Sequence, residues 1–301
     1  MNGVRLKDNV RCPYCGRDLN ETPGIKRIKE HVIGRKFIPK TYLENEWNFI
    51  VDACDDCNNE KGWLENGLST ISTLKLTGNS DLPIEVQDDL KRKIGNPGSD
   101  NIFGKSKHPE TNEPVANSFI ETKIKGNLGK ANISFSFTAP PQAPTSETSL
   151  ACYHIQAFFF LISNVNANDI KKSKAFTQKS IYLSKEYIKP LYILREPDWG
   201  NIPALELTKR TRNWRIFCNI NTAKGFFRAV IRKSPDEEKS SFFWALEWNK
   251  SIRIIGMIMN SEQNYAVLEN LPKEPLEKIN STVSVRKERQ IKKEDDILFS
   301  S

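Results

Sequence analysis

Apolar and polar positions within residues 1–75 predict two short strands followed by a helix. The first strand pattern runs over 25–33, and the second covers 47–53. A helical pattern then covers 58–68, and two aspartates stand just before it, where acidic residues favour the start of a helix. The order strand, loop, strand, helix predicts a compact module.

The later part of the chain predicts a buried helix and an antiparallel sheet. The apolar run 150–165 is interrupted by four polar residues, so a buried helix explains it better than a membrane span. Alternating residues on either side of a Gly-Asn-Leu-Gly turn predict a hairpin over 119–138. Further strand patterns cover 215–220, 225–232, 242–248 and 252–259.

These patterns predict an α+β fold in three parts. Residues 1–75 form the small module, 76–117 a helix and linker, and 118–301 a larger α+β domain with an antiparallel sheet. Within the larger domain, the stretch 139–149 is rich in Pro, Ser and Thr and is expected to be a connector. The role of the larger domain is expected to be substrate binding or partner binding.

The charge of the chain favours a polyanionic partner. Its formal net charge is +8. Residues 1–66 carry 11 Lys/Arg and 11 Asp/Glu, whereas residues 171–260 carry 18 Lys/Arg against 8 Asp/Glu. A protein that grips phosphates would therefore do so mainly with the later region. The charge-dense tail 285–296 is expected to be a frayed segment or a solvated helix.

Four of the six cysteines, Cys12, Cys15, Cys54 and Cys57, stand in two C-x-x-C pairs. No basic-then-apolar signal segment is evident, so a cytoplasmic location is expected and metal binding is a better interpretation than disulfides. Two such pairs can present four thiolates tetrahedrally, which suits Zn(II). The 38 residues between the pairs exceed the gap of an ordinary zinc ribbon, so the intervening loop is expected to hold something besides the metal.

That loop and its surroundings contain further motif elements. After the first C-x-x-C come Glu30-His31 at the end of a strand, Asn48 opening the second strand, and Cys-x-x-Cys-Asn-x-x-Lys leading into the helix. In this order they resemble the HNH endonuclease family, which has the ββα-metal fold, and the resemblance covers residues 12–65, about a fifth of the chain. Each element is weak alone, but their shared order is a strong signal.

The resemblance implies roles for five residues. His31 corresponds to the general base that deprotonates a water for attack on the scissile phosphate. Glu30 and Asn58 correspond to ligands of a catalytic divalent ion, Mg(II) or Mn(II). Asn48 corresponds to the residue that orients the histidine and steadies its loop, and Lys61 could contact a phosphate.

Elementary chemistry supports the same assignment. Phosphodiester cleavage needs an activated water, charge neutralisation at the phosphate and help for the leaving oxygen. A neutral imidazole supplies the first, and a hard cation held by carboxylate and amide oxygens supplies the other two. The four-cysteine zinc is a separate, structural ion, because a closed four-sulfur site has no open position for substrate.

Two groups of cations are candidate substrate contacts, each with a simpler alternative. Arg35 and Lys36 lie in the loop 34–46 and could contact DNA, although a solvated loop explains them equally well. Basic residues interleaved with aromatics at 209–233 would suit a surface that tracks phosphates, among them Arg212, Arg215 and Arg228. In strands, however, such aromatics often face the core while the cations face water.

Two tryptophans and two histidines are expected to be structural. Trp244 and Trp248 are interpreted as core residues of a strand. His154 stands in the apolar helix pattern and His108 in a Lys- and Pro-rich loop.

The sequence therefore predicts a metal-dependent endonuclease that nicks or cuts DNA, as a restriction or phage-defence effector that acts with partner proteins. Two alternatives stay open. One is a non-catalytic, zinc-dependent nucleic-acid-binding subunit, and the other is an RNA-directed nuclease. The intact set of Glu30, His31, Asn48 and Asn58 argues against the first, since a retired site has no physical need for that combination.

Overall fold

The fold is given by a computed structural model of the chain. It describes residues 4–5, 9–43, 48–76, 82–88, 144–164, 181–236, 241–260 and 266–300. The expected hairpin over 119–138, most of the expected linker and His108 lie outside these ranges. In the described part, no helix has both the length and the apolar character needed to cross a membrane.

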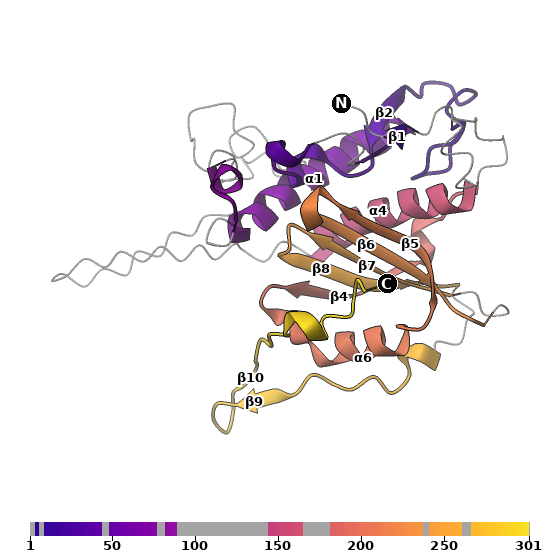
Figure 1. The fold of residues 1–301 in the computed structure, drawn as a ribbon. Coiled ribbons are helices and arrows are strands. Elements are labelled where there is room, and N and C mark those ends of the chain that lie inside the picture. Colours follow the sequence, from indigo (N-terminus) through magenta and orange to yellow (C-terminus); the bar gives the residue numbers. More distant parts are fainter. Residues whose placement is uncertain are drawn as a thin grey trace.

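A ββα element stands near the N-terminus, as the sequence predicts (Figure 1). Its parts are β2 (Arg27–His31), β3 (Phe49–Cys54) and α1 (Asp55–Leu76), and β1 (Val4–Arg5) adds a third strand to its sheet. Strand β3 is central, with β2 antiparallel on one side and β1 parallel on the other. Helix α1 follows β3 without a loop, so the end of the strand and the first turn of the helix share one corner.

The larger part of the described chain contains a five-stranded sheet in which every neighbouring pair is antiparallel. The strands are β4 (Ile188–Arg195), β5 (Arg215–Thr222), β6 (Phe227–Lys233), β7 (Phe242–Trp248) and β8 (Ile252–Ile258). Their order across the sheet is β4-β8-β7-β6-β5. Four of the five strands match the sequence prediction, and the fold class is α+β.

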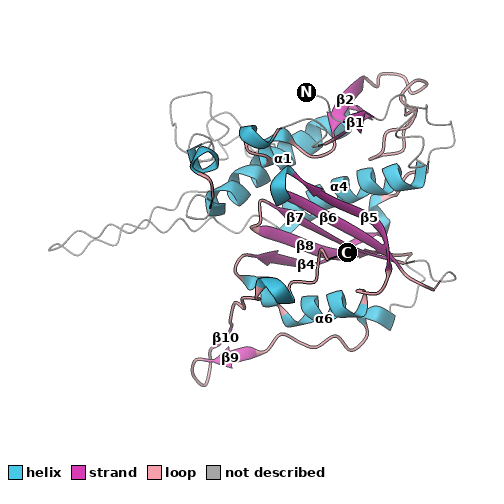
Figure 2. Cartoon of the chain, viewed as in Figure 1, coloured by secondary structure: helices cyan, strands magenta, loops and turns pink. Residues whose placement is uncertain are grey.

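Helices cover both faces of this sheet (Figure 2). Helix α4 (Pro144–Asn164) lies on one face and the short α6 (Ile202–Arg210) on the other. Strand β7 shows how both faces are filled: Trp244 and Trp248 belong to the core cluster that contains α4, whereas Phe243 belongs to the cluster that contains α6. The two tryptophans are core residues, as expected.

The ββα element and the sheet share one hydrophobic core. The cluster that holds α4 also contains Leu64, Leu68 and the loop residues Phe37 and Ile38. The Phe37 ring stacks on Trp248, with 6.1 Å between centroids. The long loop after β2 is thus a docking segment, and it carries two short 3-10 helices, η1 (Arg35–Phe37) and η2 (Lys40–Tyr42).

Helix α4 begins earlier than the sequence suggested. Residues 144–149 were expected in a connector, but they form the first turns of this helix. Proline is well tolerated at a first helical position, because its missing N–H would have no partner there. The buried carboxylate of Glu147 also anchors this end through both of its oxygens to Arg195, at 2.8 and 2.9 Å.

The charged tail is neither frayed nor a helix, contrary to expectation. Its regular elements are β10 (Ser284–Arg286), which pairs with β9 (Leu276–Lys278) earlier in the chain, and the 3-10 turn η8 (Lys293–Asp295). Arg253 of the sheet binds Asp296 at 2.5 Å, and Leu298 is buried in the α6-side core. These contacts hold the tail against the sheet, which its charge pattern could not reveal. Other 3-10 turns are η4 (Lys185–Tyr187), η5 (Asp198–Gly200), η6 (Ala223–Gly225) and η7 (Ala266–Leu268).

Candidate functional site

The two C-x-x-C pairs come together at the corner between β3 and α1. In the first knuckle, Gly16 N–H donates to the carbonyl of Cys12 at 2.9 Å, and Cys12 N–H donates to the carbonyl of Arg17 at 2.9 Å. Gly16 has φ +72°, a left-handed conformation that glycine adopts without strain. Cys54 ends β3 and Cys57 lies in the first turn of α1, so the second pair faces the first.

The four sulfurs of Cys12, Cys15, Cys54 and Cys57 could hold a zinc ion. All four lie within 4.8 Å of one another, and the sulfurs of Cys15 and Cys54 are 3.7 Å apart. A tetrahedral zinc with bonds of about 2.3 Å places its sulfurs about 3.8 Å from one another. Both the donor chemistry and the spacing therefore fit the structural zinc that the sequence predicts.

Arg17 is a partner of this cluster that sequence reasoning missed. Its guanidinium donates to the sulfur of Cys15 at 3.2 Å and to that of Cys54 at 3.3 Å, and it also binds Asp56 at 2.8 Å. Hydrogen bonds from Cys12 and Cys57, with a further one from Arg17, lower the pKa of Cys15. The hydrogen bond to Cys15 raises the pKa of Cys12 to about 12. The Arg17 guanidinium thus favours the thiolate form of Cys15.

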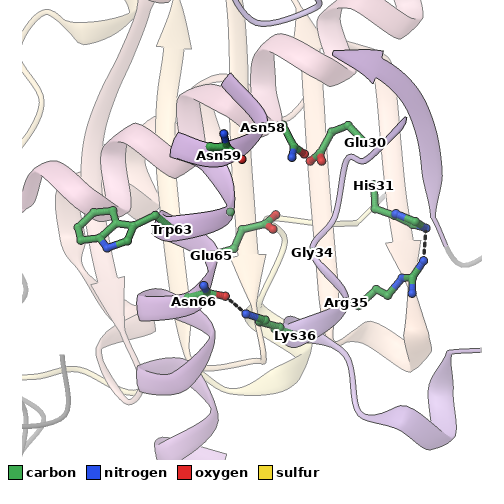
Figure 3. A pocket seen from close by; sticks show the side chains of 11 residues that line it. Glu30, His31, Gly34, Arg35, Lys36, Asn58, Asn59, Trp63, Glu65 and Asn66 are labelled. Carbon is green, nitrogen blue, oxygen red and sulfur yellow. Dashed lines mark hydrogen bonds between the residues drawn. The ribbon is translucent and has the colours of Figure 1, made fainter. Parts of the chain in front are cut away.

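A pocket of about 610 Å³ lies between the end of β2 and the first turns of α1 (Figure 3). Its lining residues come from β2, the following loop and α1: Glu30, His31, Gly34, Arg35, Lys36, Asn58, Asn59, Gly62, Trp63, Glu65 and Asn66. Three of the four residues that the sequence assigns to catalysis, Glu30, His31 and Asn58, line this one pocket. These three residues come together because β2 pairs with β3, and β3 leads directly into α1.

His31 is held as a neutral imidazole. Its Nε2 lies 3.0 Å from the guanidinium of Arg35, which can only donate, so Nε2 is the accepting nitrogen (Figure 3). Burial, followed by the nearby charges of Arg35 and Lys61, lowers the pKa of His31 below its ordinary value of 6.5. A histidine that stays neutral near pH 7 has the protonation state that a general base needs.

Asn48 fixes the loop that follows His31. Its buried amide donates to the carbonyl of Ile33 at 2.5 Å and accepts from Ile33 N–H at 3.0 Å. It also accepts from Phe49 N–H at 2.8 Å. Asn48 does not line the pocket. These hydrogen bonds hold the start of the loop after His31, and the role expected for Asn48 in orienting His31 stays a prediction.

Lys61 is buried between two carboxylates. Its side chain has 0% exposure, and its ammonium binds Glu30 at 2.6 Å, Glu65 at 2.5 Å and the carbonyl of His31 at 3.2 Å. Burial alone would lower the pKa of Lys61, but Glu65 and Glu30 more than offset it and raise that pKa. A direct contact between Lys61 and a substrate phosphate does not fit this geometry, because its three donors are already used inside the protein.

Glu30 and Asn58 provide hard oxygen donors on one side of the pocket. Both side chains line the pocket, Glu30 from β2 and Asn58 from the first turn of α1 (Figure 3). Lys61 binds Oε1 of Glu30, which leaves the other oxygen as the one a cation would use. Carboxylate and amide oxygens are the donors that Mg(II) and Mn(II) prefer, so this pair suits the expected divalent ion.

The predicted substrate-binding cations have different surroundings. Arg35 and Lys36 line the pocket, and Lys36 binds Asn66 (Figure 3). Among the later arginines, Arg212 and Arg215 are exposed on the surface. Arg228 is instead bound through two nitrogens to the buried Glu247, at 2.9 and 2.8 Å. Arg228 thus belongs to the interior charge network of the sheet rather than to a phosphate-binding surface.

Glu65 lines the pocket and is another residue that the sequence prediction missed. It stands four residues after Lys61 on α1, so helical periodicity alone places the two side chains on one face. The C-x-x-C-N-x-x-K motif ends at Lys61 and gave no reason to extend the site by another turn.

Among known proteins, no family model, curated protein or solved structure matches this chain. The family resemblance therefore depends on the local motifs and on the ββα element.

Proposed function

We propose that this protein is a metal-dependent endonuclease that hydrolyses phosphodiester bonds of nucleic acid, with DNA as the expected substrate. The observation that carries the proposal is that Glu30, His31 and Asn58 line one pocket on a ββα element whose adjoining corner holds four clustered cysteines. This juxtaposition supplies a neutral base and a pair of hard oxygen donors in the same small volume.

His31 acts as the general base in this proposal. The lone pair of Nε2 is held by Arg35 before substrate binds. A phosphate entering the pocket offers Arg35 a stronger, charge-assisted partner, which frees Nε2 for a water. The imidazole then takes a proton from that water as its oxygen attacks phosphorus and the bond to the leaving oxygen breaks. A divalent ion held by Glu30 and Asn58 would neutralise charge on the phosphate and on the leaving oxygen.

Charge at the pocket supports a phosphate-bearing substrate. Arg35 and Lys36 line it beside His31, and burial lowers the pKa of Lys36. A bound phosphate would favour the charged form of Lys36, because an anion near an ammonium favours protonation. The net charge of +8 acts in the same direction over the whole chain.

A nucleic-acid-binding subunit without cleavage is the second candidate. The observation in its favour is the 2.6 Å ion pair between Lys61 and Glu30, because Lys61 competes with a divalent ion for that carboxylate. This candidate predicts salt-sensitive binding of nucleic acid with no metal-dependent product.

Incubation of the zinc-loaded chain with supercoiled plasmid, single-stranded DNA and RNA tests the proposal. Each substrate is followed over time with Mg(II), with Mn(II) and with EDTA. Cleavage of DNA that requires the divalent ion is the expected result. Cleavage of RNA alone would change the substrate assignment, and binding of all three without any product would favour the binding subunit.

A further inference from the structure

Four titratable side chains form a buried chain that leads from the pocket to helix α4. Glu30 and Glu65 are 8% and 9% exposed, and the Lys61 ammonium lies between them. His154 of α4 has 0% exposure, and its Nε2 lies 3.8 Å from Glu65 Oε1. The sequence separates His154 from Glu65 by 89 positions, so only the fold brings the last member into place.

The packing around Glu65 leaves its carboxylate little freedom. A side chain at Gly34, in the loop just after β2, would collide with that carboxylate. The His154 ring near this carboxylate is enclosed by the aromatic rings of Phe37, Phe158 and Trp248. The Glu65 carboxylate therefore lies against the loop of the pocket and beside a polar ring of α4, a helix that is not part of the ββα element, and it makes no hydrogen bond to that ring.

The charges of these four side chains explain why Glu65 matters for cation binding at Glu30. Burial lowers the pKa of His154 to about 4, so this imidazole is neutral near pH 7. One ammonium shared by two carboxylates leaves the group with one net negative charge. If Glu65 were neutral, the Lys61 charge would be directed at Glu30 alone, and that carboxylate would hold a second cation less well.

We propose that Glu65 is a positioning residue for the cation-binding carboxylate Glu30, that it acts through Lys61, and that His154 of α4 keeps it in place. The proposal rests on the proposed function in one respect, since it takes Glu30 as a ligand of the divalent ion. It goes beyond that function because it makes the metal affinity of the ββα element depend on α4.

Direct binding of Mn(II) to the zinc-loaded full chain tests this without any need for cleavage. Free Mn(II) is measured by its electron paramagnetic resonance signal as protein is added. We expect Glu65→Gln to weaken Mn(II) binding about 10-fold or more, the usual effect of removing a partner of a metal ligand. Glu60→Gln, an exposed carboxylate on the same helix, is the matched control and is expected to stay within about twofold of wild type.

Two further variants separate positioning from simple loss of folding. Glu65→Asp keeps the negative charge beside Lys61 and is expected to recover part of the lost affinity. His154→Phe keeps a ring in the aromatic cage and removes both nitrogens, and it is expected to weaken Mn(II) binding in the same direction but less. For each variant, a far-ultraviolet circular dichroism spectrum matching that of wild type is required.

The outcomes distinguish this inference from the proposed function. Wild-type Mn(II) affinity in folded Glu65→Gln would overturn it, and so would Mn(II) binding that does not change in Glu30→Gln. Wild-type affinity in folded His154→Phe would overturn the part played by α4. If Mn(II) binding depends on Glu30 and Glu65 while no nucleic acid is ever cut, this inference stands and the nuclease proposal fails.

Discussion

The side-chain amide of Asn48 pairs with both backbone polar groups of Ile33, donating to its carbonyl at 2.5 Å and accepting from its N–H at 3.0 Å. Ile33 lies two residues after His31, at the point where the chain leaves β2. The amide thereby continues the pairing of β2 with β3 beyond the end of β2. It also fixes the start of the loop that carries Arg35 into the pocket.

Replacing Asn48 is expected to lower both activity and stability. Asn48→Ala leaves the buried N–H and carbonyl of Ile33 without these partners, which costs about 1–3 kcal/mol. We expect cleavage to fall by about 100-fold, because small displacements of catalytic groups have effects of this size. Initial cleavage rates and urea denaturation check both effects. Asn219→Ala, on an exposed position of β5, should change neither, and an unchanged rate in Asn48→Ala would contradict the role.

Removal of zinc is expected to unfold the ββα element. Cys12 and Cys54 are fully buried, and the element has little apolar core apart from the part it shares with α4 and the sheet. Cys54→Ser should lose bound zinc and helical circular dichroism, whereas Cys152→Ala, in α4, should keep its zinc. A zinc-free protein with the wild-type spectrum would show that the four cysteines have another purpose.

Arg17 is expected to strengthen zinc binding from outside the sulfur cluster. Arg17→Ala removes two donors to the cysteine sulfurs and should lower zinc affinity about 10-fold. Competition with a chromophoric chelator measures this affinity. Arg11→Ala removes a nearby exposed cation and serves as the control. Equal zinc retention in both variants would mean that the sulfur contacts of Arg17 do not matter.

Loss of the Lys61 charge is expected to destabilise the fold rather than to weaken substrate binding selectively. Lys61→Met leaves two buried carboxylates without their cation, a change that typically costs about 3–5 kcal/mol. The unpaired Glu30 and Glu65 would have raised pKa values when folded, so this variant should regain stability as the pH falls from 7 towards 5. Urea denaturation at several pH values measures this. Wild-type stability with weakened substrate binding would restore the phosphate-contact role.

Two arginines of the sheet, Arg215 and Arg228, are expected to differ in their effects on nucleic-acid binding and on stability. Arg215→Ala removes an exposed cation from edge strand β5 and, if nucleic acid lies there, should reduce the salt dependence of binding by about one phosphate contact. Arg228→Ala breaks the ion pair with Glu247 and should mainly lower stability. Fluorescence anisotropy at several salt concentrations, together with thermal melts, distinguishes the two. A larger binding defect in folded Arg228→Ala would reverse the assignment.

The pH dependence of cleavage is expected to report the lowered pKa of His31. Only the neutral imidazole can accept a proton, so the rate should fall about tenfold per pH unit on the acid side. Because the pKa is lowered by burial and by Arg35, the midpoint should lie below 6.5. In Arg35→Ala the midpoint should move up towards the ordinary value, whatever happens to the maximal rate. A midpoint well above 7 in wild type would argue against His31 as the base.

The sequence could predict the parts of the site that depend on short spacings. Two C-x-x-C pairs identify a metal cluster because each forms its own knuckle, and the structure confirms that the four sulfurs gather. The strands β6, β7 and β8 were also predictable, since their apolar runs stand between clear turn residues. Both kinds of signal are local in the chain.

What the sequence could not predict depends on contacts between distant segments. Lys61 is buried because two carboxylate partners compensate its charge. A lysine that follows a metal-binding motif looks the same in the sequence whether it is buried or exposed. His154 was interpreted as structural because nothing near it in the chain suggests Glu65 as a neighbour. Arg253 of the sheet holds the tail through its ion pair with Asp296, and the charge pattern of the tail does not indicate this ion pair.

The most direct test of the central claim compares wild type and His31→Ala on supercoiled plasmid with Mg(II), after zinc content and circular dichroism have shown that both are intact. The account predicts that the wild type converts plasmid in a reaction that EDTA stops, and that His31→Ala loses this activity by about 100-fold or more, the usual effect of a general base. Equal conversion by the two proteins would contradict the account, because the cleavage would then owe nothing to His31.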